Sequence, residues 1–180
     1  MTSRNNSIEP QPVERNSFPE TILLATVQGT FRAKFSEHGL CDLQFPKAGP
    51  PKDDTTKLPA TRHSWGKLTA AALKAVLAGK CPVELPPLDL SIGTPFQQAV
   101  WRQMLKIRPG QTKSYGEIAR AIDRPNAVRA VGGACGANPI PVLVPCHRVL
   151  AANGQLGGFS GGLDWKRRLL AIEGHTEFEV

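Results

Sequence analysis

A cysteine followed directly by a histidine, Cys146-His147, is the pair whose residue types could carry out nucleophilic chemistry. It follows an apolar run, Val142-Leu143-Val144, which we expect to be buried. Burial alone raises the pKa of a thiol and makes it inert. A neighbouring imidazole that is itself oriented by a carboxylate can reverse this effect and supply a thiolate. Cys146 is therefore a candidate nucleophile; the competing interpretation is a core cysteine, since free thiols are commonly buried.

Adjacency in the sequence does not by itself bring the two side chains together. Neighbouring side chains of an extended chain point to opposite faces. Cys146 and His147 can therefore cooperate only through a turn of the backbone or a bridging water. A cysteine hydrolase is one function compatible with the pair, and it would process its substrate through many turnovers.

The charge of the chain is concentrated in the half that holds this pair. The 180 residues carry a net charge of +7. Residues 1–90 hold 11 basic and 9 acidic residues, whereas residues 101–168 hold 11 basic and only 3 acidic ones. A local basic excess is typical of a surface that binds a polyanion. We therefore expect nucleic acid as the partner.

Two capping boxes predict helices ahead of the pair. Thr94 and Gln97 have the spacing of a capping box, with Pro95 at the first helical position. Ser114 and Glu117 repeat this spacing and predict a second, short helix.

A third helix is predicted from Ala127 to about Gly136, after the break Arg124-Pro125-Asn126. Two short helices joined by a tight turn are typical of a helix-turn-helix motif. The third helix holds mostly small residues and one long cation, Arg129. Such a helix suits close approach to the DNA minor groove. The alternative is tight packing of the same Gly/Ala face against another helix.

Strands are predicted in the N-terminal half. Apolar residues alternate in 21–27, 31–35 and 43–45, which predicts a three-stranded antiparallel meander. In the first of these strands, one face is expected to hold Leu23, Ala25 and Val27.

The remaining N-terminal segments are predicted as follows. Residues 1–20 are polar and form a flexible tail, and 46–59 form a loop. Helical spacing over 61–77 predicts a helix with Gly79 as its C-cap. Residues 81–93 are rich in proline and extended, and we place the domain boundary near residue 91.

Composition points to a cytoplasmic protein, or a nuclear one if eukaryotic, because no apolar run is long enough to span a bilayer and the N-terminus lacks a secretory pattern. The four cysteines form no CxxC pair and are expected to be free thiols. Zinc is an inorganic alternative, but the spacing fits no compact template, so no metal site is predicted. The residues considered for zinc are His38, Cys41, His63 and Cys81.

The Cys-His pair is one member of a series of motifs. These are Thr94-Pro95-Phe96-Gln97-Gln98-Ala99-Val100-Trp101, Ser114-Tyr115-Gly116-Glu117, Arg129-Ala130-Val131-Gly132-Gly133-Ala134, Asn138-Pro139, Pro145-Cys146-His147-Arg148-Val149, Gly158-Phe159-Ser160-Gly161-Gly162 and Ala171-Ile172-Glu173-Gly174. In this order and spacing the series closely resembles the O6-alkylguanine-DNA alkyltransferases, which repair DNA by direct reversal. The resemblance is strong here and weak in the N-terminal half.

The resemblance implies an α+β fold. A small ribonuclease-H-like α/β domain (21–90) would pack on a mainly helical domain of the winged-helix or helix-turn-helix type (91–174). The latter would carry DNA binding and alkyl transfer. Tails at 1–20 and 175–180 would flank the two domains.

Roles for the catalytic residues are also implied. Cys146 would accept the alkyl group, with His147 acting on it through a water. Glu173 would orient His147, and Asn138 would brace the turn that carries the cysteine. Without the resemblance, Glu173 would be interpreted as a solvated helix-end carboxylate and Asn138 as a turn former.

A second set of residues would handle the DNA. Tyr115, the only tyrosine, would crowd the backbone so that a nucleotide rotates outward, and would donate to the departing guanine. Arg129 would fill the gap left in the base stack. Arg124, Gln97 and Ala130 are the further DNA contacts. The alternatives are an amphipathic ring at a helix start for Tyr115 and phosphate contact or solvation for Arg129.

The base pocket would be lined by Phe159 and Ser160. The backbone N–H of Ser160 would lie near the guanine oxygen. The Val149 carbonyl would accept from the exocyclic amine, and Lys166 would support Tyr115. Phe159 stands where some relatives carry tyrosine, so the width of the pocket is left open.

The implied activity is that of a methylated-DNA–protein-cysteine methyltransferase. It is an irreversible, single-use transfer of the alkyl group from O6-alkylguanine in double-stranded DNA to Cys146, after base flipping from the minor groove. O4-alkylthymine and cooperative assembly on DNA are left open; a monomer with no cofactor, metal or membrane partner is expected. The alternative is a non-catalytic helix-turn-helix damage sensor or transcription regulator. Relatives that only sense damage carry tryptophan at the nucleophile position.

Overall fold

The computed structural model describes residues 20–47, 49 and 59–178. The predicted tail 1–20, apart from Glu20, lies outside the described residues, as does most of the predicted loop 46–59.

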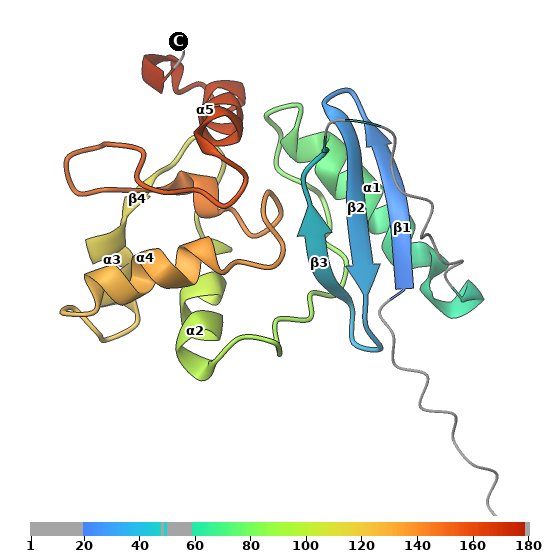
Figure 1. Cartoon of the computed structure of the whole chain (residues 1–180), viewed down its shortest axis with the longest axis horizontal. Helices are drawn as coiled ribbons and strands as arrows, with labels where there is room; N and C mark the ends of the chain where they lie inside the picture. Colours follow the sequence, from blue (N-terminus) through green and yellow to red (C-terminus); the bar gives the residue numbers. More distant parts are fainter. Residues whose placement is uncertain (1–19, 48, 50–58, 179–180) are drawn as a thin grey trace, which may run out of the picture.

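The N-terminal half contains a three-stranded antiparallel sheet, as predicted (Figure 1). β1 (Glu20–Thr26) pairs with β2 (Gly29–Phe35), and β2 pairs with β3 (Leu40–Gln44). The strands follow one another in the sheet in chain order because each connection is a short turn.

Leu23 and Ala25 share one face of β1, as predicted, but Val27 lies beyond the strand and the core is covered by the other face. Leu24 lies opposite Phe31 and Ile22 lies opposite Ala33, so the even-numbered side chains of β1 share the face of the fully buried Phe31 and Ala33. Val27 is 93% exposed because it lies in the turn beyond the end of the strand. Without Val27, the only apolar residues of the odd-numbered face are Leu23 and Ala25, which Ile22 and Leu24 match on the even-numbered face.

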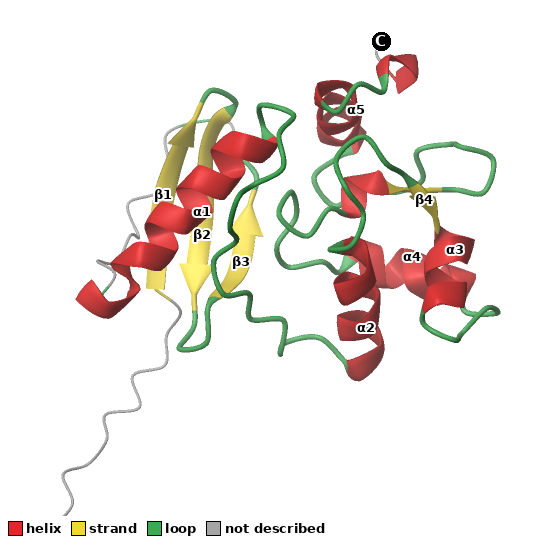
Figure 2. Cartoon of the chain, turned by 180° about the vertical axis from the view of Figure 1, so that it is seen from behind, coloured by secondary structure: helices red, strands yellow, loops and turns green. Residues whose placement is uncertain are grey.

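One helix crosses a face of this sheet (Figure 2). α1 (His63–Val76) follows the 3-10 turn η1 (Ala60–Arg62). Gly79 has a φ of +70°, in agreement with the predicted glycine C-cap. Farther on, Leu88 forms a parallel bridge with Leu40 of β3, so the predicted extended segment lies along the edge of the sheet.

The C-terminal half is mainly helical, and both predicted capping boxes form. α2 begins at Pro95, the predicted first helical position, and ends at Met104. A two-residue parallel pair joins β4 to β5 and is too short to leave a periodic signal in the sequence. The elements are α2 (Pro95–Met104), β4 (Lys113–Ser114), α3 (Tyr115–Ala121), α4 (Val128–Gly136), η2 (Cys146–Arg148), β5 (Val149–Leu150), α5 (Leu163–Ile172) and η3 (Thr176–Phe178).

The predicted α+β class is confirmed, and the C-terminal end is more ordered than predicted. Thr176–Phe178, expected to belong to a tail, form a 3-10 turn in contact with α5. Within the part of the chain that the structure describes, no helix has the length and apolar character needed to span a membrane.

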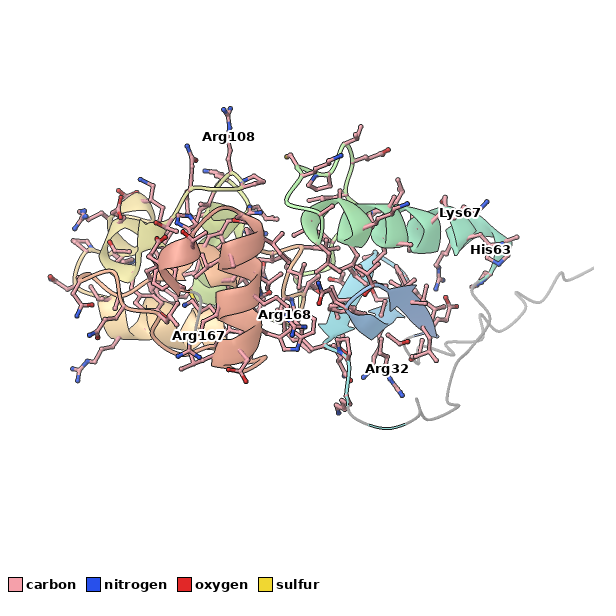
Figure 3. All side chains as sticks on the ribbon, turned by 90° about the horizontal axis from the view of Figure 1, so that it is seen from above. Arg32, His63, Lys67, Arg108, Arg167 and Arg168 are labelled. Atoms are coloured by element: carbon pink, nitrogen blue, oxygen red, sulfur yellow. The ribbon has the colours of Figure 1, made fainter. Side chains whose placement is uncertain are left out.

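An aromatic cluster joins the two halves. Phe31 of β2 and Phe45, just after β3, both contact Trp165 of α5, with ring centroids 5.7 and 4.8 Å away. Arg168 lies on the side of α5 that faces the sheet (Figure 3). Its guanidinium lies over the Trp165 ring, and its Nη1 donates to Gln28 Oε1 at 2.9 Å. The core is therefore continuous between the sheet and the helical half.

Candidate active site

Cys146 lies in a tight turn rather than in extended chain. The preceding Val142, Leu143 and Val144 are at most 4% exposed, as predicted. Val142 has a φ of +74°, which is strained for a β-branched residue. The turn continues into η2, where the Cys146 N–H donates to the Val144 carbonyl at 2.8 Å. The backbone turn that the Cys-His pair would need is thus present, but no hydrogen bond joins Cys146 Sγ to the His147 ring among the described residues.

Asn138 ties this turn together. Its Nδ2 donates to the Val144 carbonyl at 2.7 Å and to Cys146 Sγ at 3.1 Å, and its Oδ1 accepts from the Ile140 N–H at 3.0 Å. Asn138 is 6% exposed. The structure thus brings the predicted brace and the predicted nucleophile into direct contact.

His147 and Glu173 are also in contact. His147 Nε2 lies 3.0 Å from Glu173 Oε1, and the two side chains are 0% and 1% exposed. Glu173 closes α5, whose C-terminus carries it to η2. The other ring nitrogen, His147 Nδ1, is buried and has no hydrogen-bond partner among the described residues.

Arg148 belongs to the same cluster, and the sequence analysis missed its role. Its Nε and Nη2 donate to the Glu173 carboxylate at 3.0 and 2.7 Å, and its Nη1 donates to the Ile107 carbonyl at 2.5 Å. The guanidinium is 7% exposed. Its place inside the Pro-Cys-His-Arg-Val motif was the available signal, but the partner lies 25 residues farther along the chain.

The charges of the cluster at neutral pH follow from burial and contact. Burial raises the pKa of Cys146 to about 11, an effect that the Asn138 hydrogen bond only partly offsets. Burial lowers the pKa of His147, and the contacts from His147 and Arg148 outweigh burial to hold the pKa of Glu173 at about 2. The resting site therefore pairs a neutral thiol and neutral imidazole with a carboxylate. Burial of the Cys146 thiol thus favours its protonated form, and His147 must take the proton before Cys146 can react as a thiolate.

Lys166 was expected to support Tyr115, and among the described residues no hydrogen bond joins the two side chains directly. Lys166 is fully buried and donates to the carbonyls of Val149, at 2.7 Å, and Leu156. Burial lowers its pKa to about 8. Lys166 therefore fastens the loop after β5 to that strand. The Val149 carbonyl, predicted to accept from the exocyclic amine of guanine, thus accepts from Lys166 in this structure.

A cavity of about 520 Å³ lies between α4 and the loop before α5. It brings together the predicted residues Tyr115, Arg129, Phe159 and Ser160. Cys146 is 3% exposed and is not among the described residues that line it. Burial, followed by the nearby Cys135 and Cys146, raises the pKa of Tyr115, so its hydroxyl remains protonated and can donate. The other lining residues are Val128, Gly132, Gly136 and Gly158.

The remaining residues predicted to contact DNA differ in exposure. Arg124 and Ala130 are exposed, next to and on α4. Gln97 is half-buried, and its Oε1 accepts from the Thr94 N–H at 2.8 Å in the capping box. Its amide nitrogen is the group that could reach a phosphate.

The glycines of α4 have no packing role inside the protein. A Cβ added at Gly132, Gly133 or Gly136 would meet no other atom within 4 Å. Packing of this face against another helix, the alternative left open by the sequence, would place atoms there. The opposite face of α4 is buried through Val131 and Ala134.

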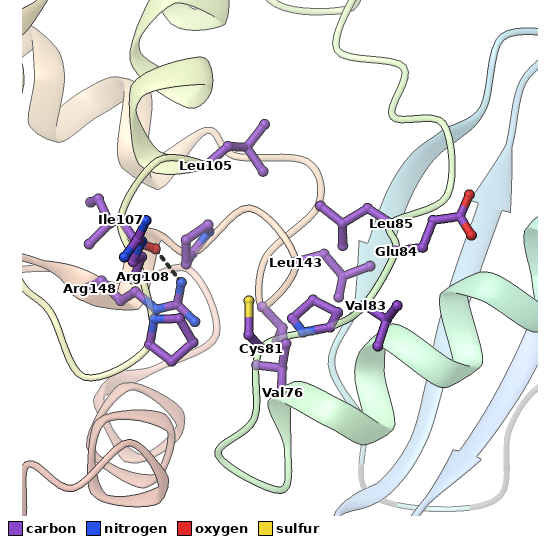
Figure 4. Close-up of a pocket in the computed structure, with 14 residues that line it drawn as sticks. Val76, Cys81, Val83, Glu84, Leu85, Leu105, Ile107, Arg108, Leu143 and Arg148 are labelled. Carbon is purple, nitrogen blue, oxygen red and sulfur yellow. Dashed lines mark hydrogen bonds between the residues drawn. The ribbon is translucent and has the colours of Figure 1, made fainter.

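A second cavity, of about 330 Å³, lies where the segment after α1 meets the C-terminal half (Figure 4). Leu85, Leu105 and Leu143 line it together with Arg148. In the described ranges, no group of three or more His, Cys, Asp or Glu side chains could hold a metal ion. Cys41, considered for zinc, instead donates through Sγ to the Lys34 carbonyl at 3.3 Å.

Comparisons with known proteins identify a family whose members are similar to this chain. The family model for the DNA-binding domain of 6-O-methylguanine DNA methyltransferase matches residues 95–175. A methylated-DNA–protein-cysteine methyltransferase from Mycobacterium tuberculosis is 52% identical over 101 residues, which cover 56% of this chain and only 61% of that protein. One from Methanosarcina acetivorans is 41% identical over 141 residues, covering 77% of this chain and 87% of the relative.

The fold is shared as well. The crystal structure of Mycobacterium tuberculosis OGT in complex with DNA superposes with a TM-score of 0.70 at 39% identity, covering 86% of this chain and 91% of that one. The chain belongs to the O6-methylguanine DNA methyltransferase family.

Proposed function

We propose that this protein repairs double-stranded DNA by moving the alkyl group of O6-alkylguanine, and of O4-alkylthymine if it fits, onto its own Cys146. The observation that carries the proposal is the buried cluster in which Asn138 contacts Cys146 and Glu173 contacts His147. A dry thiol next to an oriented, neutral imidazole is suited to one nucleophilic displacement.

DNA would be bound by the exposed face of α4. Its glycines leave open space rather than filling a packing contact, so a second backbone can come close there. Arg129 and Arg124 on this side supply positive charge without many long side chains. A helix of this kind suits the minor groove.

The damaged base would rotate out of the duplex into the cavity between α4 and Phe159. A base inside the stack cannot offer its 6-oxygen to a protein thiol, and extrusion costs a few kcal/mol. Arg129, at the rim of the cavity, would occupy the gap left in the stack. Because Cys146 does not line the cavity, the entering base must displace side chains that cover the sulfur.

The proton of the thiol would leave through His147. A carboxylate can only accept, so the neutral ring carries its proton on Nε2, facing Glu173. Nδ1 then holds a lone pair, and it is the ring atom without a partner among the described residues. This tautomer makes Nδ1 the base for Cys146, through a water as the resemblance implies. Glu173 stabilises the imidazolium that forms.

Alkyl transfer would follow by in-line displacement. The bond between Cys146 Sγ and the alkyl carbon forms while the bond from that carbon to guanine O6 breaks. The thiol proton moves to His147, and the electron pair leaves with the guanine, to which the Tyr115 hydroxyl can donate a hydrogen bond. The guanine then takes a proton from water, and the imidazolium of His147 returns its proton to water. The product is a thioether at Cys146, which makes each molecule a single-use enzyme.

Titration of the protein with a duplex that contains one O6-methylguanine tests the proposal. We expect repair to stop after one equivalent of lesion per protein, and we expect no repair by Cys146→Ala. Continued turnover would favour a hydrolase. Repair that is absent in both proteins, together with unchanged binding to damaged DNA, would favour a damage sensor.

A further inference from the structure

Phe159 forms an aromatic wall of the cavity between α4 and the loop before α5. The side chain is half-buried, and its own neighbours must therefore hold the ring in place. One such neighbour is Phe45, whose ring lies edge-on to that of Phe159, with centroids 5.7 Å apart and planes at 62°. This is a favourable geometry for an aromatic pair.

Two further aromatic rings, those of Trp165 and Phe31, hold Phe45 in place. Its ring centroid lies 4.8 Å from that of Trp165 and 5.7 Å from that of Phe31. Phe31 is fully buried in the sheet, and Trp165 is covered by the Arg168 guanidinium at 5.2 Å. Phe45 therefore cannot turn away without opening the contact between the two halves.

The loop next to Phe159 is fitted to the same ring. A Cβ on Gly161 would collide with ring carbons of Phe45 and would come within 3.0 Å of Phe159 Cε1. Glycine is thus required at 161 because the backbone passes directly over Phe45. The N-terminal half sets the course of this loop, although residue 45 lies outside the matched region 95–175.

We propose that Phe45 is a specificity-determining residue, which positions Phe159 and thereby limits the size of the alkyl group that the site accepts. The inference rests on the proposed function. Loss of the Phe45 ring would let Phe159 tilt outward and widen the cavity. A methyl group would then be held less well, and a bulky aromatic group would fit better.

The test compares reaction rates of O6-methylguanine and O6-benzylguanine in the same duplex. Phe45→Leu keeps an apolar side chain but removes the ring. We expect its benzyl-to-methyl rate ratio to rise about tenfold over the unmodified protein, a change typical of altered pocket contacts. Phe159→Ala should shift the ratio in the same direction, and Phe45→Leu should add little to it in the double variant.

Phe35→Leu is the matched control, because Phe35 is a fully buried ring of the same sheet that is not part of the aromatic cluster. It should lower the melting temperature without moving the ratio. An unchanged ratio in Phe45→Leu, or an equal shift in Phe35→Leu, would overturn the inference. If the unmodified protein accepts an alkyl group from neither lesion, the proposed function fails instead.

Discussion

The Glu173 carboxylate is shared between His147 and Arg148, both of which it contacts within 3.0 Å while remaining 1% exposed. One acidic group thus fixes the tautomer of the imidazole and neutralises a buried guanidinium. Arg148 in turn reaches the Ile107 carbonyl, so the chain after α2, the turn η2 and the end of α5 meet at a single point.

Glu173→Gln should impair both roles of the carboxylate, and each loss can be measured separately. The neutral amide no longer stabilises the imidazolium, so we expect methyl transfer to slow by about 100-fold. It also leaves Arg148 without its counter-charge, which should lower the free energy of unfolding by about 3 kcal/mol. Single-turnover repair kinetics and urea unfolding measure the two effects. Glu177→Gln, a change at an exposed carboxylate, is the control, and a wild-type rate in Glu173→Gln would exclude the proposed relay.

The free energy of unfolding should decrease in two steps as the pH is lowered. The pKa of His147 is depressed below 6.5 in the folded state, so its contribution is present above that value and is lost as pH falls. The pKa of Glu173 is depressed from 4.5 to about 2, so its contribution is lost as pH falls from 4.5 towards 2.

Urea unfolding of the protein and of Glu173→Gln across this range checks the second step. The stability difference between them should narrow below pH 4.5. A difference that stays constant down to pH 2 would show that the carboxylate is not stabilised as a charged group.

Asn138→Ala should affect both the thiol and the turn. The hydrogen bond from Asn138 lowers the pKa of Cys146, so its loss should slow transfer at neutral pH more than at high pH. The Ile140 N–H and Val144 carbonyl lose their partner, which should cost about 2 kcal/mol of stability. Repair rates as a function of pH measure the first effect. Asn153→Ala, at an exposed turn, should show neither effect.

Gly133→Leu tests the proposed surface of α4. The position is exposed and its Cβ would point into open space. Leucine should therefore stabilise the helix by about 0.5–1 kcal/mol. The same side chain would stand between α4 and the groove and should weaken binding to a duplex about tenfold. Fluorescence anisotropy measures the affinity for DNA, and thermal unfolding measures the stability. Ala71→Leu on α1 is the control. Unchanged DNA affinity would place the contact elsewhere.

Local interactions were the part of this structure that could be predicted from sequence. The boxes at Thr94 and Ser114 form as expected because each depends on residues three positions apart. Val27 was wrongly assigned to β1 because it continues the alternation into a turn. The contacts of Arg148 with Glu173 and of Lys166 with Val149 could not be predicted for a different reason: the partners are distant in sequence, and no spacing rule connects them.

The most direct measurement maps the alkyl group after one equivalent of O6-methylguanine duplex has reacted. Peptide mass spectrometry should find a single methyl group, on the peptide that contains Cys146. The peptides with Cys41, Cys81 and Cys135 should be unmodified. A methyl group on any of those three thiols, or repaired DNA with no methylated protein, would contradict the assignment of Cys146 as the acceptor.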